Sequence, residues 1–78
     1  MVTYTANQAA SALNCDVHKI ELLRKNKLLH GIRMGKRGWI YSEENLKEFW
    51  DEYIDEDLSS PESIKTVASL HRANKKSD

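Results

Sequence analysis

Gly35-Lys36-Arg37-Gly38 is the stretch that decides the fold predicted for this 78-residue chain. It lies between two short apolar runs, Leu28–Met34 and Trp39–Tyr41, which we interpret as strands. Both glycines can adopt the positive φ that tight hairpin loops require. The stretch therefore predicts a β-hairpin whose tip carries two adjacent cations.

Two short helices are predicted before this hairpin. Thr5 and Gln8 have the spacing of a capping box, and Asn14 suits the left-handed end of a first helix. Asp16 is then the N-cap of a second helix. The inner stripe of this second helix consists of Val17, Ile20 and Leu23. Because that stripe is narrow, we expect the second helix to be shallowly packed and its opposite face to be exposed.

A third helix is predicted after the hairpin. Ser42 is its N-cap, and two glutamates follow in the first turn, where the helix dipole favours anions. Its apolar residues recur at helical spacing, and we expect all of them in the core: Leu46, Phe49, Trp50, Tyr53 and Ile54.

The remaining residues predict a linker and a tail. Residues 55–60 are polar, and Ser60-Pro61 has the pattern of a helix start. The thin apolar stripe that follows predicts a tail that docks, stays partly helical or folds on a partner. We therefore divide the chain into a domain at residues 1–58 and a C-terminal tail at residues 59–78.

The net charge is zero, but the charges are segregated along the chain. Residues 17–38 hold seven Lys or Arg against one Glu, a net charge of +6. Residues 42–58 hold eight Asp or Glu against one Lys, a net charge of −7. The basic segment coincides with the second helix and the hairpin, which is the distribution of a nucleic-acid binder. The acidic segment is either a solvated helix face or a protein-contact surface.

The composition argues against several other classes of protein. The single Cys15 forms no internal disulfide and fits a reducing cytosol, where we interpret it as a packing residue. The three histidines are scattered, so no spacing predicts a metal site, and we expect no cofactor. No catalytic constellation is present, and we expect no enzyme. The sequence has no membrane-spanning run and no secretory signal, which predicts a cytoplasmic, nucleoid-associated protein of a bacterial host.

Residues 3 to about 50 resemble the excisionase-type winged helix-turn-helix, a relative of the MerR DNA-binding domain. The chain has Asn14, and Asn26-Lys27, where that family commonly has glycines, which leaves the end of the second helix open. The segments that carry the resemblance are Tyr4–Ala10, Leu13–Asp16, Ile20 with Leu23, Leu28, Arg33–Arg37, Trp39–Ser42 and Leu46.

The resemblance implies an α+β, mostly helical fold: a winged helix-turn-helix with a two-stranded hairpin wing, followed by the helical or flexible tail. It also implies a phage or mobile-element excisionase, a recombination directionality factor that binds double-stranded DNA and has no catalysis of its own. Its partners would be DNA, an integrase and further copies of the chain along DNA. The alternatives are a small transcriptional regulator of the same fold, or a protein-interaction module such as an anti-repressor or packaging adaptor.

The DNA-binding residues are predicted on two elements. Lys36 and Arg37 at the wing tip would contact phosphates, with support from Arg33. Arg24 lies toward the core side of the second helix, and we expect it to reach the DNA backbone or to pair with acids of the third helix. The exposed face of the second helix would lie in the major groove, with the candidates His18, Lys19, Glu21, Leu22 and Lys25.

Overall fold

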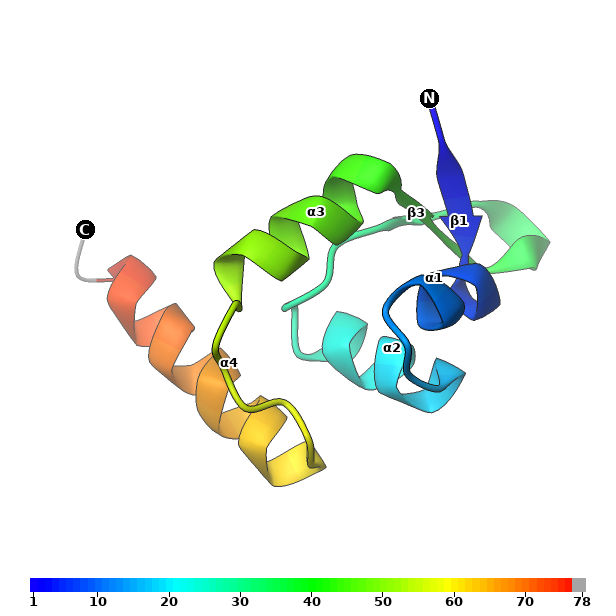
Figure 1. Cartoon of the computed structure of the whole chain (residues 1–78). Helices are drawn as coiled ribbons and strands as arrows, with labels where there is room; N and C mark the ends of the chain where they lie inside the picture. The colour runs from blue at the N-terminus through cyan, green and yellow to red at the C-terminus, as the bar shows by residue number, and fades with distance from the viewer. Residues whose placement is uncertain (77–78) are drawn as a thin grey trace.

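Four helices and a small sheet make up the part of the chain that the computed structural model describes, which is the backbone of residues 1–76 and the side chains of residues 1–36 and 38–71 (Figure 1). The helices are α1 (Ala6–Ala12), α2 (Val17–Lys25), α3 (Glu43–Glu52) and α4 (Pro61–Lys76). The strands are β1 (Thr3–Thr5), β2 (Ile32–Arg33) and β3 (Trp39–Ser42), and a 3₁₀ turn, η1 (Gly35–Arg37), joins β2 to β3. The fold is α+β and mostly helical.

The caps predicted from the sequence begin the helices. Thr5 and Gln8 form the reciprocal capping box of α1. The Asp16 carboxylate accepts the Lys19 backbone N–H at the start of α2. Ser42 caps α3, and Asn45 completes a second capping box there. These bonds satisfy backbone N–H groups that the first turn of a helix leaves free.

Both short helices end in a Schellman motif. Asn14 (φ 58°) and Lys27 (φ 64°) hold the left-handed positions after α1 and α2. After α2, the Leu28 N–H donates to the Leu23 carbonyl and the Lys27 N–H to the Arg24 carbonyl, both at 2.9 Å. The end of α2 that the sequence left open therefore lies at Lys25, and it is Lys27, not Asn26, that adopts the positive φ.

The sheet is antiparallel in the order β1-β3-β2, and it contains one strand more than predicted. Thr3 to Thr5 pair with Ser42 to Ile40, so β3 is the central strand. The predicted first strand was too long, since only Ile32–Arg33 pairs with β3. Leu28 and Leu29 instead form a buried loop, at 3% and 1% exposure.

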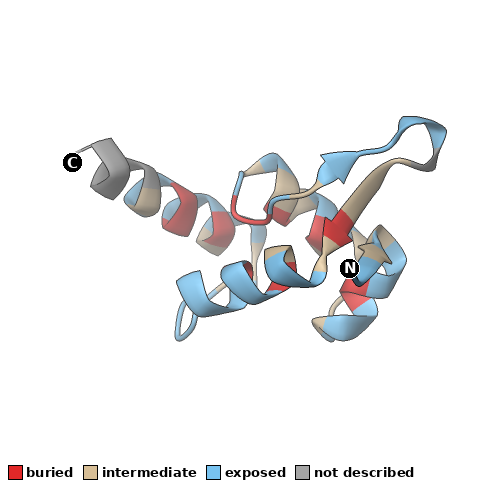
Figure 2. Ribbon diagram, turned by 90° about the horizontal axis from the view of Figure 1, so that it is seen from above, coloured by how far each residue is buried: buried red, intermediate tan, exposed pale blue. Residues whose placement is uncertain are grey.

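The β2–β3 hairpin has the expected turn and projects from the body of the molecule (Figure 2). Gly35 and Gly38 have φ of 59° and 83°, and the Met34 N–H donates to the Gly38 carbonyl at 2.8 Å. Ile32 and Met34 on this hairpin are 64% and 58% exposed. The hairpin is thus held by its own hydrogen bonds and the sheet, and the described side chains of β2 and the tip are exposed.

One hydrophobic core joins all four helices. The buried residues include Ala9, Ala10, Ile20, Leu23, Leu28, Leu29, Tyr41, Leu46, Phe49, Ile64, Val67 and Ala68. The two alanines of α1 let α2 approach closely, as their spacing predicts. Because Ile64, Val67 and Ala68 belong to the same cluster, α4 is docked on the body rather than free.

The prediction that all five apolar residues of the third helix lie in the core was wrong for two of them. Leu46 and Phe49 are buried and Tyr53 is half-buried, but Trp50 is 57% and Ile54 58% exposed. The helix ends at Glu52, and Asp55 (φ 69°) turns the chain away toward α4. The periodicity identified the apolar face but not how much of it a neighbouring element covers.

Replacing Lys27 with Gly is expected to raise the free energy of unfolding by about 0.5–1 kcal/mol. The left-handed conformation costs an L-residue about 1–2 kcal/mol, and the greater freedom of glycine in the unfolded chain offsets part of the gain. Urea unfolding measures the difference. Lys27→Ala is the control, because it removes the same charge and keeps the strain. Equal stability of the two variants would contradict this account.

Candidate functional site

The exposed face of α2 holds three of the five predicted groove residues. His18, Glu21 and Lys25 are exposed and lie on one side of the helix. The other two lie differently. Leu22 is half-buried and packs against the core, so the prediction of an exposed leucine was wrong. Lys19 is half-buried and lies near enough to Asp57 for its charge to help lower the pKa of that carboxyl, after the hydrogen bonds from Ser59.

The cations of the hairpin are Arg33 on β2 and the pair at the tip. Arg33 is exposed and lies opposite Trp39 across the strand pair. Lys36 is exposed in η1. The side chain of Arg37 lies outside the described residues. Its backbone is in η1, so it belongs to the same tip as Lys36.

Arg24 connects α2 to the hairpin. Its guanidinium carbon lies 4.4 Å from the centroid of the Trp39 ring, a cation–π contact. Of the two expectations for Arg24, the pairing with acids of the third helix was wrong. The ion pairs among the described side chains do not include Arg24, and its guanidinium stacks on Trp39 instead. Arg24 Nε and Tyr41 Oη are both buried without a hydrogen-bond partner. Burial raises the pKa of Tyr41, and the positive charge of Arg24 opposes that rise.

A basic hollow of about 450 Å³ opens between the end of α2 and the hairpin. Its basic residues are Arg24, Lys25, Lys27 and His30, and Trp39 forms part of its wall. Among the described residues, no Asp or Glu lines it. Sequence reasoning counted Lys27 among the basic residues but gave no role to it or to His30. Lys27 and His30 flank the buried Leu28 and Leu29 in the chain. This placement indicates that both line the hollow only once residues 28–29 are known to form a loop rather than a strand.

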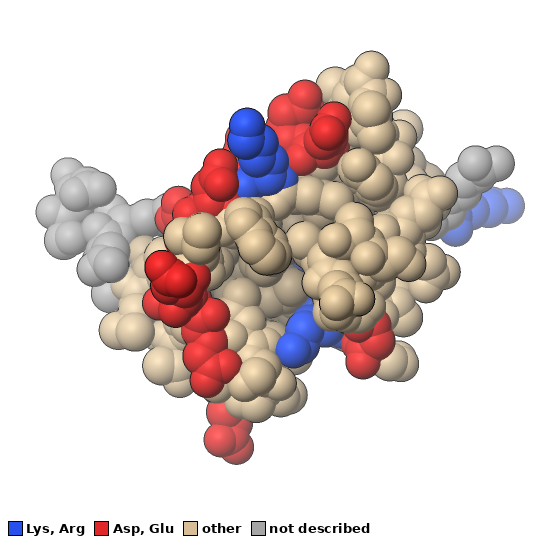
Figure 3. Space-filling model, viewed as in Figure 1, with Lys and Arg blue, Asp and Glu red and all other residues tan. Residues whose placement is uncertain are grey.

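The charges segregate in space as they do along the chain. Figure 3 shows acidic side chains gathered over α3 and the segment leading into α4, with a basic side chain among them, and basic atoms at the hairpin end and beside α2, where acidic atoms also lie. Among the side chains that the structure describes, the close contacts between a basic and an acidic side chain are those of His71 with Glu52 (3.4 Å) and Glu56 (3.3 Å). The described lysines and arginines of α2 and the hairpin therefore form no ion pair with a described side chain.

The cysteine and the candidate metal ligands were also compared with the arrangements that reactive thiols and metal sites require. Cys15 is half-buried, and burial raises the pKa of its thiol, which keeps it protonated at neutral pH. In residues 1–71, no cluster of His, Cys, Asp or Glu has the arrangement of a metal site. None of the described helices is long and apolar enough to cross a membrane.

Comparisons with known proteins add no relative. No family model matches the chain, and searches of curated proteins and of solved structures found no similar one. The function is therefore argued from the residues and their arrangement.

A double-mutant cycle on Arg24 and Trp39 is expected to give a coupling energy of about 1 kcal/mol, the usual size of a partly buried cation–π contact. The variants are Arg24→Met, Trp39→Leu and the double mutant, compared by urea unfolding. The cycle is needed because Arg24→Met also removes a buried, unpaired Nε, which offsets part of its cost. Additive effects would show that the stack does not join α2 to the hairpin.

Proposed function

We propose that this protein binds double-stranded DNA as a winged helix-turn-helix, with α2 in the major groove and the β2–β3 hairpin as a wing on the phosphate backbone. The observation that carries the proposal is a set of exposed cations with no ion-pair partner among the described side chains: Lys25 on α2, Lys27 just after it, and Arg33 and Lys36 on the hairpin. An exposed helix beside a projecting basic hairpin is the arrangement that places one element in a groove and the other on the strand next to it.

The roles of the residues follow from their placement. Lys25 and His18 are the best supported groove candidates, because both side chains are exposed. Both can also donate a hydrogen bond to guanine O6 or N7. Glu21 on the same face accepts from cytosine N4 or repels phosphate. Leu22 and Lys19 are no longer groove candidates in this proposal, because their partial burial limits how far their side chains reach toward the bases. Lys36, Arg37 and Arg33 would contact phosphates and supply affinity rather than sequence choice.

The biological role we propose is that of an excisionase-type accessory factor of a phage or mobile element. Its support is the order of the elements, from capped helix through turn, second helix, basic hairpin and third helix. A small transcriptional regulator would use the same surface. The two differ in where the DNA site lies: footprinting on attachment-site and promoter fragments distinguishes them.

Replacing Lys36 and Arg37 together by alanine is expected to weaken binding to all duplexes and to reduce the slope of log K against log salt by about two, one for each lost phosphate contact. Fluorescence anisotropy with a random-sequence duplex, at several salt concentrations, measures both quantities.

The matched control removes two cations elsewhere. Lys47 on α3 and Lys65 on α4 are both exposed, so Lys47→Ala/Lys65→Ala changes the net charge equally. This control is expected to keep the wild-type slope. If the wild-type protein binds no duplex at low salt, or if both double mutants behave alike, the proposal fails.

A further inference from the structure

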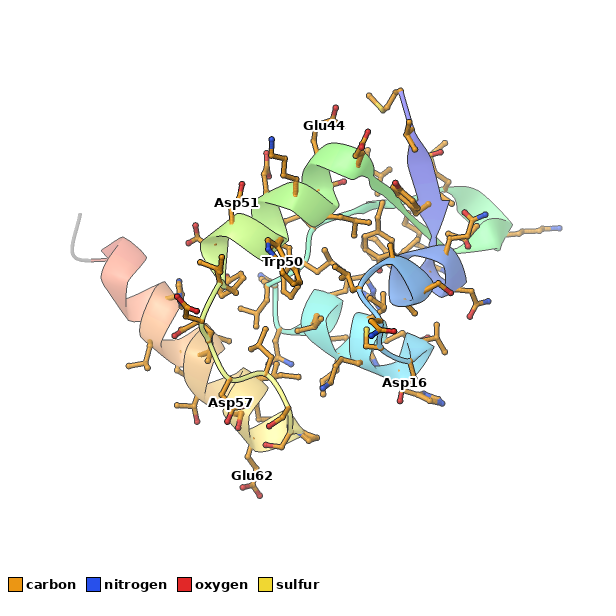
Figure 4. The ribbon with its side chains drawn as sticks, in the orientation of Figure 1. Asp16, Glu44, Trp50, Asp51, Asp57 and Glu62 are labelled. Carbon is orange, nitrogen blue, oxygen red and sulfur yellow. The ribbon has the colours of Figure 1, made fainter. Side chains whose placement is uncertain are left out.

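Trp50 and Ile54 are the starting point of a second inference, because they are large apolar side chains that the core leaves uncovered. They are 57% and 58% exposed and four residues apart in the chain, with Trp50 on α3 and Ile54 just after the helix ends at Glu52. Single exposed apolar residues are ordinary, but neighbouring ones that form a patch mark interaction sites. Trp50 lies at the edge of α3 nearest the linker that carries Asp57, and Asp51 leaves α3 on another side (Figure 4).

These two side chains line a notch of about 200 Å³ at the end of α3. Leu58, half-buried, comes from the linker that passes beside the helix, and the floor is formed by Phe49 and Tyr53. The notch is a separate place from the basic hollow beside α2, with which it shares no lining residue. Its volume and apolar lining suit one large apolar side chain of a partner.

Local hydrogen bonds preform the linker side of this notch. The Glu56 N–H donates to the Tyr53 carbonyl at 3.1 Å, next to the left-handed Asp55. The Asp57 carboxylate accepts the Ser59 N–H at 3.0 Å and its hydroxyl at 2.6 Å. Because the linker is already ordered, binding of a partner here loses little conformational entropy in the linker, and a smaller loss of entropy makes binding stronger.

The rim of the notch carries strong negative charge. Asp55 and Glu56 line it directly, and Asp51 and Asp57 adjoin it in the chain. Hydrogen bonds from Ser59 hold the pKa of Asp57 below its ordinary value, so this carboxylate is charged at neutral pH. Glu56 has one described partner, His71, at 3.3 Å. An acidic rim around an apolar centre repels anionic surfaces and attracts cationic ones.

We propose that this notch, formed by Phe49, Trp50, Tyr53, Ile54 and Leu58, binds a basic segment of a partner protein that inserts one large apolar side chain beside Trp50. The occupant is a cationic amphipathic peptide segment, since the apolar centre excludes a purely polar ligand and the acidic rim excludes nucleic acid. The inference does not depend on DNA binding, which uses α2 and the hairpin.

The test uses the full chain labelled with ¹⁵N and a short synthetic peptide of leucines and lysines as the probe. The indole N–H signal of Trp50 is expected to shift saturably, while that of Trp39 stays in place. A peptide with Glu instead of Lys, and one with Ser instead of Leu, are expected not to bind. Trp50→Ala is expected to lower the affinity roughly tenfold or more, as truncation of a central tryptophan does.

Leu70→Ala is the matched control, because Leu70 is also 58% exposed but lies on α4 and does not line the notch. It is expected to bind the leucine–lysine peptide as the wild type does. All three apolar side chains are exposed, so Ile54→Ala is a second folded variant should Trp50→Ala prove unstable by circular dichroism.

Three outcomes would overturn the proposal. Equal binding of the serine–lysine peptide would mean that charge alone attracts the probe. Equal losses in Trp50→Ala and Leu70→Ala would mean that the notch is not the site. Concentration-dependent association of the chain alone in sedimentation, abolished by Trp50→Ala, would assign the notch to a second copy. None of these results bears on duplex binding by α2 and the hairpin.

Discussion

The burial of the Tyr41 ring on the central strand is the constraint on which the rest of the structure depends. Tyr41 is 0% exposed and faces Tyr4 across the β1–β3 pair. A Cβ at Gly31 would lie 2.7 Å from its ring, so the loop before β2 passes close only because Gly31 has no side chain. β3 therefore positions β1, the Leu28–Gly31 loop and the start of α3 together.

This arrangement also sets the relation of α2 to the hairpin. Arg24 reaches from α2 to the face of Trp39, two residues before Tyr41 on the same strand. The contact holds the Arg24 guanidinium in place at a hollow that Lys25 and Lys27 also line. Positive charge concentrated in this way raises the local concentration of an anionic ligand, and salt screens it. The stack thus fixes the position of Arg24, and the cations outside it are the ones that we propose for DNA binding.

The negative charge of residues 42–58 lowers the stability of the folded state. Residues 42–58 hold eight Asp or Glu and one Lys. Among the described side chains, the basic group in close contact with any of these carboxylates is His71, which lies beside Glu52 and Glu56. Like charges so close together repel and destabilise the compact state. Asp55 adds a left-handed backbone conformation to that cost. The strained Asp55 and the repelling carboxylates thus lie beside the exposed Trp50, at the notch that we propose as a binding site.

The sequence by itself determined the local features of this protein. The caps at Thr5, Asp16 and Ser42, the left-handed Asn14 and the glycines of the hairpin were all predicted, because each depends on a few neighbouring backbone groups. The charge segregation, and with it the candidate surface, is equally a property of the chain.

The tertiary structure decided what covers each element. Strand β1 exists because β3 offers it an edge, and three alternating residues carry too little periodicity to reveal that. Trp50 and Ile54 have the spacing of core residues, but the core closes over Leu46 and Phe49 and leaves them outside. Leu22 has the spacing of an exposed residue and is half-buried. Spacing specifies the direction of a side chain, whereas burial depends on partners distant in the chain, whose positions only the packed fold supplies.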